Sequence, residues 1–192
     1  MATAAADDTL LIMMQGKKRL LIALVWVMGL SGVGTAAAQN PKLIGNYSDW
    51  KALTFQEQGA SQGESKAGCY TIAEPIRKEG AYSTRGRVYA LVTHRPTDKK
   101  LNVITIIAGY EFKEGSGVTV EVGDEKFSLF TQQDMAWASD EDDAKIVDAM
   151  KKGSDMVVHG VSAKGAETTD TYSLIGFTKA YNAIGQACGL PQ

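Results

Sequence analysis

The chain has 192 residues, enough for one domain once a targeting segment is set aside. Its 44% hydrophobic and 22% charged residues are ordinary for a globular protein and exclude an intrinsically disordered chain. The formal net charge is −2, and no block of Lys and Arg follows residue 38, so the sequence has no electrostatic footprint for nucleic acid.

The N-terminus has the layout of a secretory signal peptide. Lys17–Arg19 form a positive region, Leu20–Leu30 are an apolar stretch, and Ala36–Ala38 supply an A-x-A cleavage pattern. We therefore expect the chain to be exported and cleaved between Ala38 and Gln39.

The alternative to a cleaved signal peptide is a membrane anchor. A spanning helix needs about 20 apolar residues, and Gly29 with the small residues after it interrupts the run early. We therefore divide the chain into an N-terminal extension with a signal peptide, residues 1–38, and one mature domain, residues 39–192. We expect no transmembrane span in the mature part.

The mature part alternates short apolar runs with polar segments. Runs of β character predict strands at Trp50–Gln56, Cys69–Ala73, Arg87–His94, Leu101–Ala108, Asp155–Ser162 and Thr168–Leu174, together with a hairpin over Gly117–Thr131 that turns at Gly123 and Asp124. Polar composition predicts loops over Asn40–Gly45, Glu57–Gly68 and Arg77–Arg85. Leu101–Ala108 is apolar at both odd and even positions, which favours a central strand covered on both faces.

Two helices are predicted in the second half. The segment from Ser139 to Gly153 has a capping box of Ser139 and Asp142, acids in its first turn, lysines in its last and a terminal glycine. From Phe177 to Cys188, apolar residues recur at helical spacing. The expected fold is mainly β, an antiparallel β-sandwich or open barrel of about seven or eight strands with these two helices.

The two cysteines, Cys69 and Cys188, both lie in the mature part. In an oxidising compartment an even count predicts a disulfide, and one pair allows one connectivity within the chain. The alternatives are two free thiols or a disulfide to a partner. A Cys69–Cys188 bond would fasten the last helix, which is prone to fray, onto the sheet.

Several segments together resemble the invasion-associated locus B family, small exported β-rich envelope proteins of Gram-negative bacteria. The matching segments are SDWKALTF, CYTIAEP, VEVGDEKFSLFTQQDMAW and KKGSDMVVHGVSAKGAETTDTYSLIGFTKAYNAIGQAC, of which YSLIGFTKA is the most specific. A common family pattern has a further cysteine soon after the first tryptophan. Here Trp50 is followed by no cysteine until Cys69, so that local disulfide cannot be transferred.

The resemblance implies a periplasmic or outer-membrane-associated protein that binds an envelope partner and, in a pathogen, assists host-cell entry. It carries over no catalytic residues, so we expect no enzymatic activity, no cofactor and no metal. The alternatives are a small-ligand carrier, a structural envelope component, and an enzyme of unrecognised type. A large apolar cavity between sheets would favour the carrier, and a cleft with strongly shifted acids would favour the enzyme.

The residue patterns that could carry chemistry have simpler explanations. The G-x-S-x-G match at Gly59–Gly63 lies in a polar loop without the strand and helix of a nucleophile elbow. His94 and His159 have no further ligand at metal spacing, so a strand-edge or surface histidine is expected at both. The acids of Asp140–Asp143 lack the EF-hand pattern for calcium and suit a helix N-terminus.

Two tryptophans, Trp50 and Trp137, are the candidate partner-binding residues. Tryptophan is enriched among the residues that dominate binding energy at protein interfaces. The same side chain also serves as core or edge packing, and the sequence leaves both interpretations open for each of the two.

Overall fold

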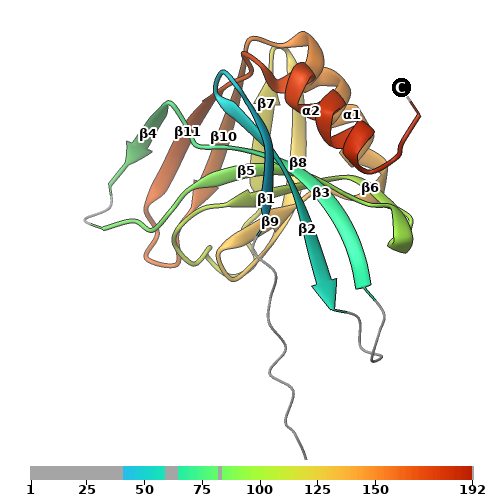
Figure 1. Ribbon diagram of the computed structural model, residues 1–192. Coiled ribbons are helices and arrows are strands. Elements are labelled where there is room, and N and C mark those ends of the chain that lie inside the picture. Colours follow the sequence, from blue (N-terminus) through green and yellow to red (C-terminus); the bar gives the residue numbers. More distant parts are fainter. Residues whose placement is uncertain (1–40, 59–64, 82–83, 192) are drawn as a thin grey trace, which may run out of the picture. The chain divides into compact units, whose positions relative to one another are not determined.

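The structure is a computed structural model and describes residues 41–58, 65–81 and 84–191. Within these residues, strands form one antiparallel sheet in the order β1-β2-β3-β5-β6-β9-β8-β7-β10-β11-β4 (Figure 1). The predicted signal peptide and the cleavage site at Ala38 and Gln39 lie outside the described residues. The strands are β1 (Lys42–Tyr47), β2 (Trp50–Gln58), β3 (Ser65–Ala73), β4 (Arg77–Gly80), β5 (Tyr89–Arg95), β6 (Lys100–Ile107), β7 (Val118–Val122), β8 (Glu125–Gln132), β9 (Met135–Trp137), β10 (Asp155–Val161) and β11 (Glu167–Ser173).

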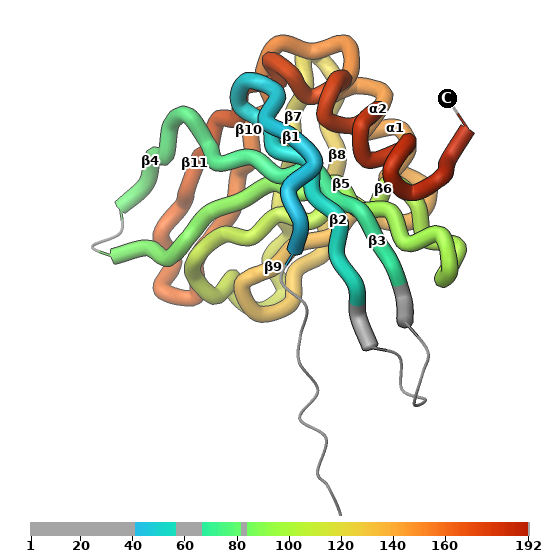
Figure 2. The backbone as a smooth tube through the Cα atoms, viewed as in Figure 1, coloured from blue at the N-terminus to red at the C-terminus, as the bar shows by residue number. Residues whose placement is uncertain are grey.

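The sheet curls so that its two halves share one core (Figure 2). On β7 the valines Val118, Val120 and Val122 all point inward and are buried, as the alternation predicts. The β7–β8 turn contains Gly123 at φ 59°, a left-handed conformation that glycine adopts without strain. The expected mainly β, antiparallel architecture is confirmed.

Two α-helices, α1 (Asp140–Lys152) and α2 (Phe177–Ala187), cover the inward side of the first half of the sheet, and a short 3-10 helix, η1 (Pro96–Asp98), links β5 to β6. Phe177 of α2 packs edge-on against Trp50 of β2, with ring centroids 4.9 Å apart. Both helices lie where the sequence predicts them. The predicted capping box is wrong in detail, because the Ser139 hydroxyl donates to the Asp142 carboxylate at 3.1 Å instead of accepting from a backbone N–H.

The strand count of seven or eight is too low, since eleven strands are present in the described residues. The missed strands β1 and β4 are the two edges of the sheet, and β9 has only three residues. All four residues of the edge strand β4 are exposed, so its sequence, RKEG, is polar and resembles that of a loop. The predicted loop over Glu57–Gly68 is shorter than expected, because β2 runs to Gln58 and β3 begins at Ser65.

The expectation that β6 is covered on both faces is also wrong. Ile104 and Ile106 are buried beneath the helices, whereas the outward residues are only half-buried and Leu101 is 42% exposed. The apolar residues on the second face of β6 therefore face outward, and this outward side becomes the candidate site below.

A candidate binding surface on the outer face of the sheet

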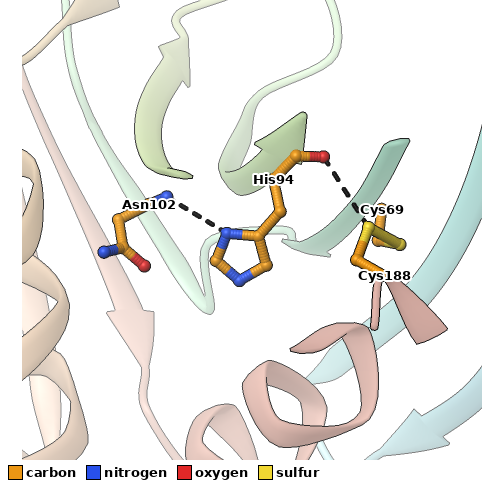
Figure 3. The surroundings of a disulfide bond; sticks show 4 residues. All are labelled: Cys69, His94, Asn102 and Cys188. Atoms are coloured by element: carbon orange, nitrogen blue, oxygen red, sulfur yellow. Dashed lines mark hydrogen bonds between the residues drawn. A yellow bond between two sulfur atoms is a disulfide. The ribbon is translucent and has the colours of Figure 1, made fainter. Parts of the chain in front are cut away.

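The disulfide joins Cys69 of β3 to Cys188 at the end of α2, with Cα atoms 6.0 Å apart (Figure 3). The expected pairing is therefore present, and neither cysteine is a free thiol. The bond lies beside His94, whose carbonyl oxygen is 3.9 Å from the Cys188 sulfur. The two cysteines lie 119 residues apart in the sequence, and their bond fastens the C-terminal end of α2 to β3.

His94 is not a surface residue, and that expectation is wrong for it. It faces inward from β5 towards α2 and is 1% exposed. Its Nδ1 accepts the backbone N–H of Asn102 at 3.1 Å, while Nε2 has no hydrogen-bond partner among the described residues. Burial, reinforced by the charge of Lys151, lowers the pKa of His94 to about 4. The ring is therefore neutral at pH 7 and packs edge-on against Tyr181 at 5.3 Å.

His159 fits the surface expectation. Its side chain is 42% exposed on β10, with Nε2 3.8 Å from the Glu121 carboxylate and Nδ1 3.1 Å from the Thr169 hydroxyl. His94 lies on β5 and His159 on β10, in different parts of the sheet. Within the described residues, no group of three His, Cys, Asp or Glu is placed to hold a metal ion.

Three of the four acids at the start of α1 have different partners. Asp140 pairs with Lys100 at 2.5 Å, and Asp142 pairs with Lys145 at 2.8 Å. Asp143 is buried and accepts the backbone N–H of Ile104 at 2.9 Å, which fastens the helix to β6. Burial raises the pKa of Asp143 to about 6. The cluster thus contributes surface ion pairs and one buried contact between α1 and β6. The G-x-S-x-G match at Gly59–Gly63, for which the sequence favours a polar loop, lies outside the described residues.

A buried ion pair that the sequence did not reveal links the segment before β5 to β11. The Arg85 guanidinium donates two hydrogen bonds to the Asp170 carboxylate, and both side chains are almost fully buried, at 4% and 3% exposed. Arg85 also donates to the Ala108 carbonyl at 2.6 Å and lies over the Tyr110 ring at 4.9 Å. Because Arg85 sits in a polar stretch, its sequence context favours a solvated loop, and only the fold brings it to Asp170. The pair holds distant strands together.

The two candidate tryptophans have different environments. Trp50 is fully buried, donates its indole N–H to the Ser173 carbonyl at 2.8 Å and packs on α2, so the partner-binding interpretation is wrong for it. Trp137 points outward from β9 and is partly exposed. Its ring lies 5.8 Å from that of Phe130, which is 59% exposed. Tryptophan is enriched among the residues that dominate binding energy at protein interfaces, so the partner-binding interpretation stays open for Trp137.

The aromatic pair belongs to a wide apolar surface, the outer face of the sheet. Cross-strand pairs place its side chains next to one another from β2 to β8, for example Leu53 beside Tyr70 and Phe130 beside Trp137. None of its members is fully buried, and the described helices pack on the opposite side. We define the outer face by the side chains of Leu53, Phe55, Tyr70, Ile72, Tyr89, Leu91, Val103, Ile107, Phe130, Met135 and Trp137.

The outer face could have been suspected from the sequence. Several strands are apolar at both parities, whereas only two helices are predicted, which is too few to cover both sides of the sheet. A contiguous apolar surface on a folded domain marks a site of interaction with another molecule. The described side chains that define this face are apolar or aromatic, a composition suited to binding.

The fold and the surface define a small antiparallel β-protein with an apolar face available for binding. The sequence profile of the family "Invasion associated locus B (IalB) protein" matches residues 50–185, from the first residue of β2 into α2. The chain therefore belongs to this family. Membership in it suggests an envelope-associated protein, and the disulfide fits that location.

Two further comparisons gave no relatives: neither a search of curated proteins nor a search of solved structures found a match. Within the described part of the chain, no helix has the length and apolar character required to cross a bilayer.

Proposed function

We propose that this protein is exported to the periplasmic side of the cell envelope and acts there by binding another envelope or outer-membrane protein, without catalysing a reaction. The observation that carries the proposal is the outer face, with Phe130 exposed and Trp137 partly exposed on its neighbouring strands β8 and β9. Family membership and the disulfide support the location. In a pathogenic source, the same adaptor role would serve host-cell entry.

The physical argument concerns what an isolated chain does with such a surface. A side chain such as Phe130, left 59% exposed, forgoes part of the stabilisation that burial provides, about 25 cal/mol for each Å² of apolar area. The inner side of the sheet, by contrast, is filled by large, fully buried side chains such as Trp50, Phe177 and Ile104, which take up the space that a carried ligand would need. Binding on the outside of the sheet is therefore favoured over transport within it.

The test is site-specific photo-cross-linking in the living cell. A photo-reactive amino acid replaces Phe130 on the outer face, and in a matched control it replaces Lys145, which is exposed on α1. We expect one identified envelope protein to be captured from position 130 and not from position 145. Equal capture from both positions, or capture from neither, would contradict the proposal.

Export is checked separately. N-terminal sequencing of the protein recovered from the periplasm should start at Gln39 or an immediate neighbour. A start within residues 1–30 would show that the predicted signal peptide is retained, and the proposed location would then fail regardless of the cross-linking result.

A further inference from the structure

The outer face carries two adjoining depressions. Two depressions of about 430 Å³ and 580 Å³ share Tyr89 as a common wall. The first is lined by residues of β2, β3 and β5, and the second runs over β6 to the loop before β9. Together the two depressions, here termed the trough, cross the strands instead of following one of them.

The floor of the second depression is built by two glycines in contact. Gly86 donates its backbone N–H to the Gly109 carbonyl at 2.8 Å, and both residues line the hollow. A Cβ at Gly109 would lie 2.8 Å from the Gly86 backbone, and Gly109 has φ +71°. A side chain is therefore excluded at Gly109 by space and by conformation. The hollow exists in the folded chain without rearrangement.

The walls of the trough combine apolar and aromatic side chains. Leu53, Ile72 and Ile107 supply apolar surface, and Ile76 at its rim is 60% exposed. Tyr89 stands between the two depressions. Such a lining can contact apolar side chains of a ligand, and the Tyr89 ring can pack against them.

The charged groups of the trough are predominantly acidic. Its carboxylates are Asp49, Glu74, Glu111 and Asp134, against which the lining sets only two basic residues, Lys51 and Arg87. Among the described residues none of the four carboxylates is in an ion pair with a basic side chain. An excess of unpaired carboxylates along an apolar groove attracts cationic groups and repels anionic ones.

We infer that the trough binds an extended peptide segment of the partner in which basic residues accompany apolar ones. The trough crosses the neighbouring strands β2, β3, β5 and β6 and reaches the loop before β9, hence about four spacings of about 4.8 Å or roughly 19 Å. At about 3.3 Å for each extended residue, this length holds about six residues. The inference rests on the proposed function, and it names the chemistry of the partner segment that the outer face receives.

The test uses two synthetic hexapeptides, Lys-Leu-Lys-Tyr-Lys-Leu and its counterpart with glutamates in place of the lysines. Binding of each labelled peptide to the exported protein is followed by fluorescence anisotropy at about 50 mM and at about 300 mM salt. The higher salt concentration shortens the range of interactions between surface charges. We expect the lysine peptide to bind and to weaken at high salt. The glutamate peptide should bind at least about tenfold more weakly.

Variants assign the effect to the trough. The double change Glu74→Gln with Asp134→Asn should weaken the lysine peptide about three- to tenfold, as expected for two partly exposed charge pairs. The matched control is Asp124→Asn in the β7–β8 turn, which should change nothing. Replacing Glu74 and Asp134 by lysine should transfer the preference to the glutamate peptide, which no loss of folding could produce.

Two results would overturn the inference. One is equal binding of both peptides, and the other is competition by a neutral oligosaccharide with no dependence on salt, which would make the trough a glycan site. If cross-linking from position 130 captures a partner while the lysine peptide fails, the inference is wrong and the proposed function stands. If that cross-linking fails while the peptide binds, the trough recognises the peptide chemistry and the proposed envelope partner is wrong.

Discussion

Removal of the disulfide should destabilise the protein strongly. The bond closes a loop with a sequence separation of 119 residues. The loop-entropy relation then gives about 5 kcal/mol at 25 °C, from which residual order in the unfolded chain subtracts. We expect reduction of the bond to lower the free energy of unfolding by about 3–5 kcal/mol. At this chain length the melting temperature should fall by roughly 10 °C or more.

The effect should also be localised at the end of α2. Phe177 holds the start of that helix against Trp50, whereas the last turn is held by the disulfide and by hydrogen bonds such as that from the Cys188 N–H to the Ile184 carbonyl at 3.0 Å. Hydrogen exchange of the reduced protein should therefore lose protection first in the last turn of α2. The amides around Phe177 should change only with global stability.

The assay is denaturant unfolding of the oxidised protein, the protein reduced by a phosphine, and the double variant Cys69→Ala with Cys188→Ala. The free energies of unfolding of the reduced protein and the double variant should agree closely. Cys69 is buried, but its change to Ala removes only the sulfur atom and adds a small packing loss. Ala187→Ser, an exposed change beside the bond, is the control and should be neutral. A loss below about 1 kcal/mol, or unchanged exchange in the last turn of α2, would refute this reasoning.

Three further outcomes are expected, each readable from unfolding measurements. The pKa of His94 is about 4 in the folded chain and 6.5 when unfolded. The neutral His94 therefore contributes fully to the free energy of unfolding above pH 6.5, and this contribution is lost as the pH falls towards 4. His94→Asn should reduce the loss of stability over this pH range by up to about 3 kcal/mol. Asp143 has the opposite sign, with a pKa of about 6 against 3.8, so its contribution is present below pH 3.8 and is lost as the pH rises through 6. Asp143→Asn should therefore exceed the parent in stability above pH 6, by up to about 3 kcal/mol, and match it below pH 4; a stability difference that stays constant between these limits would contradict the assignment. Gly176→Ala should cost more than about 2 kcal/mol, because a Cβ there would lie 1.9 Å from the Tyr47 carbonyl oxygen, whereas Gly123→Ala, with nothing within 4 Å, should cost about 1 kcal/mol, and equal costs would show that backbone conformation alone decides.

The strands and helices with strong local patterns were predictable. The hairpin of β7 and β8, the helix α1 and the helix α2 each combine a period with punctuating residues, so local physics suffices to place them. The edge strand β4 lacks such a pattern, because its residues are exposed and its pairing with β11 supplies the only reason for its extended backbone. The Arg85–Asp170 pair was unpredictable for a related reason, since the two residues lie 85 positions apart.

The site was predicted only in part. The sequence left the binding and packing interpretations equally open for Trp50 and Trp137, yet one is buried under α2 and the other faces outward. Which of two similar strand residues points inward depends on the register of the strand and on which face the helices cover. Both are decided by pairing between segments far apart in the chain.

The sequence by itself determined the class of the fold, the two helices, the one possible internal disulfide and the family, because composition, periodicity and motifs are local properties of the chain. The tertiary structure alone decided that the second apolar face of the sheet stays outside, that the trough crosses four strands, and that His94 and Asp143 are buried. These features arise where strands from distant parts of the chain lie side by side. Their energies come from burial and pairing that no short stretch of residues contains.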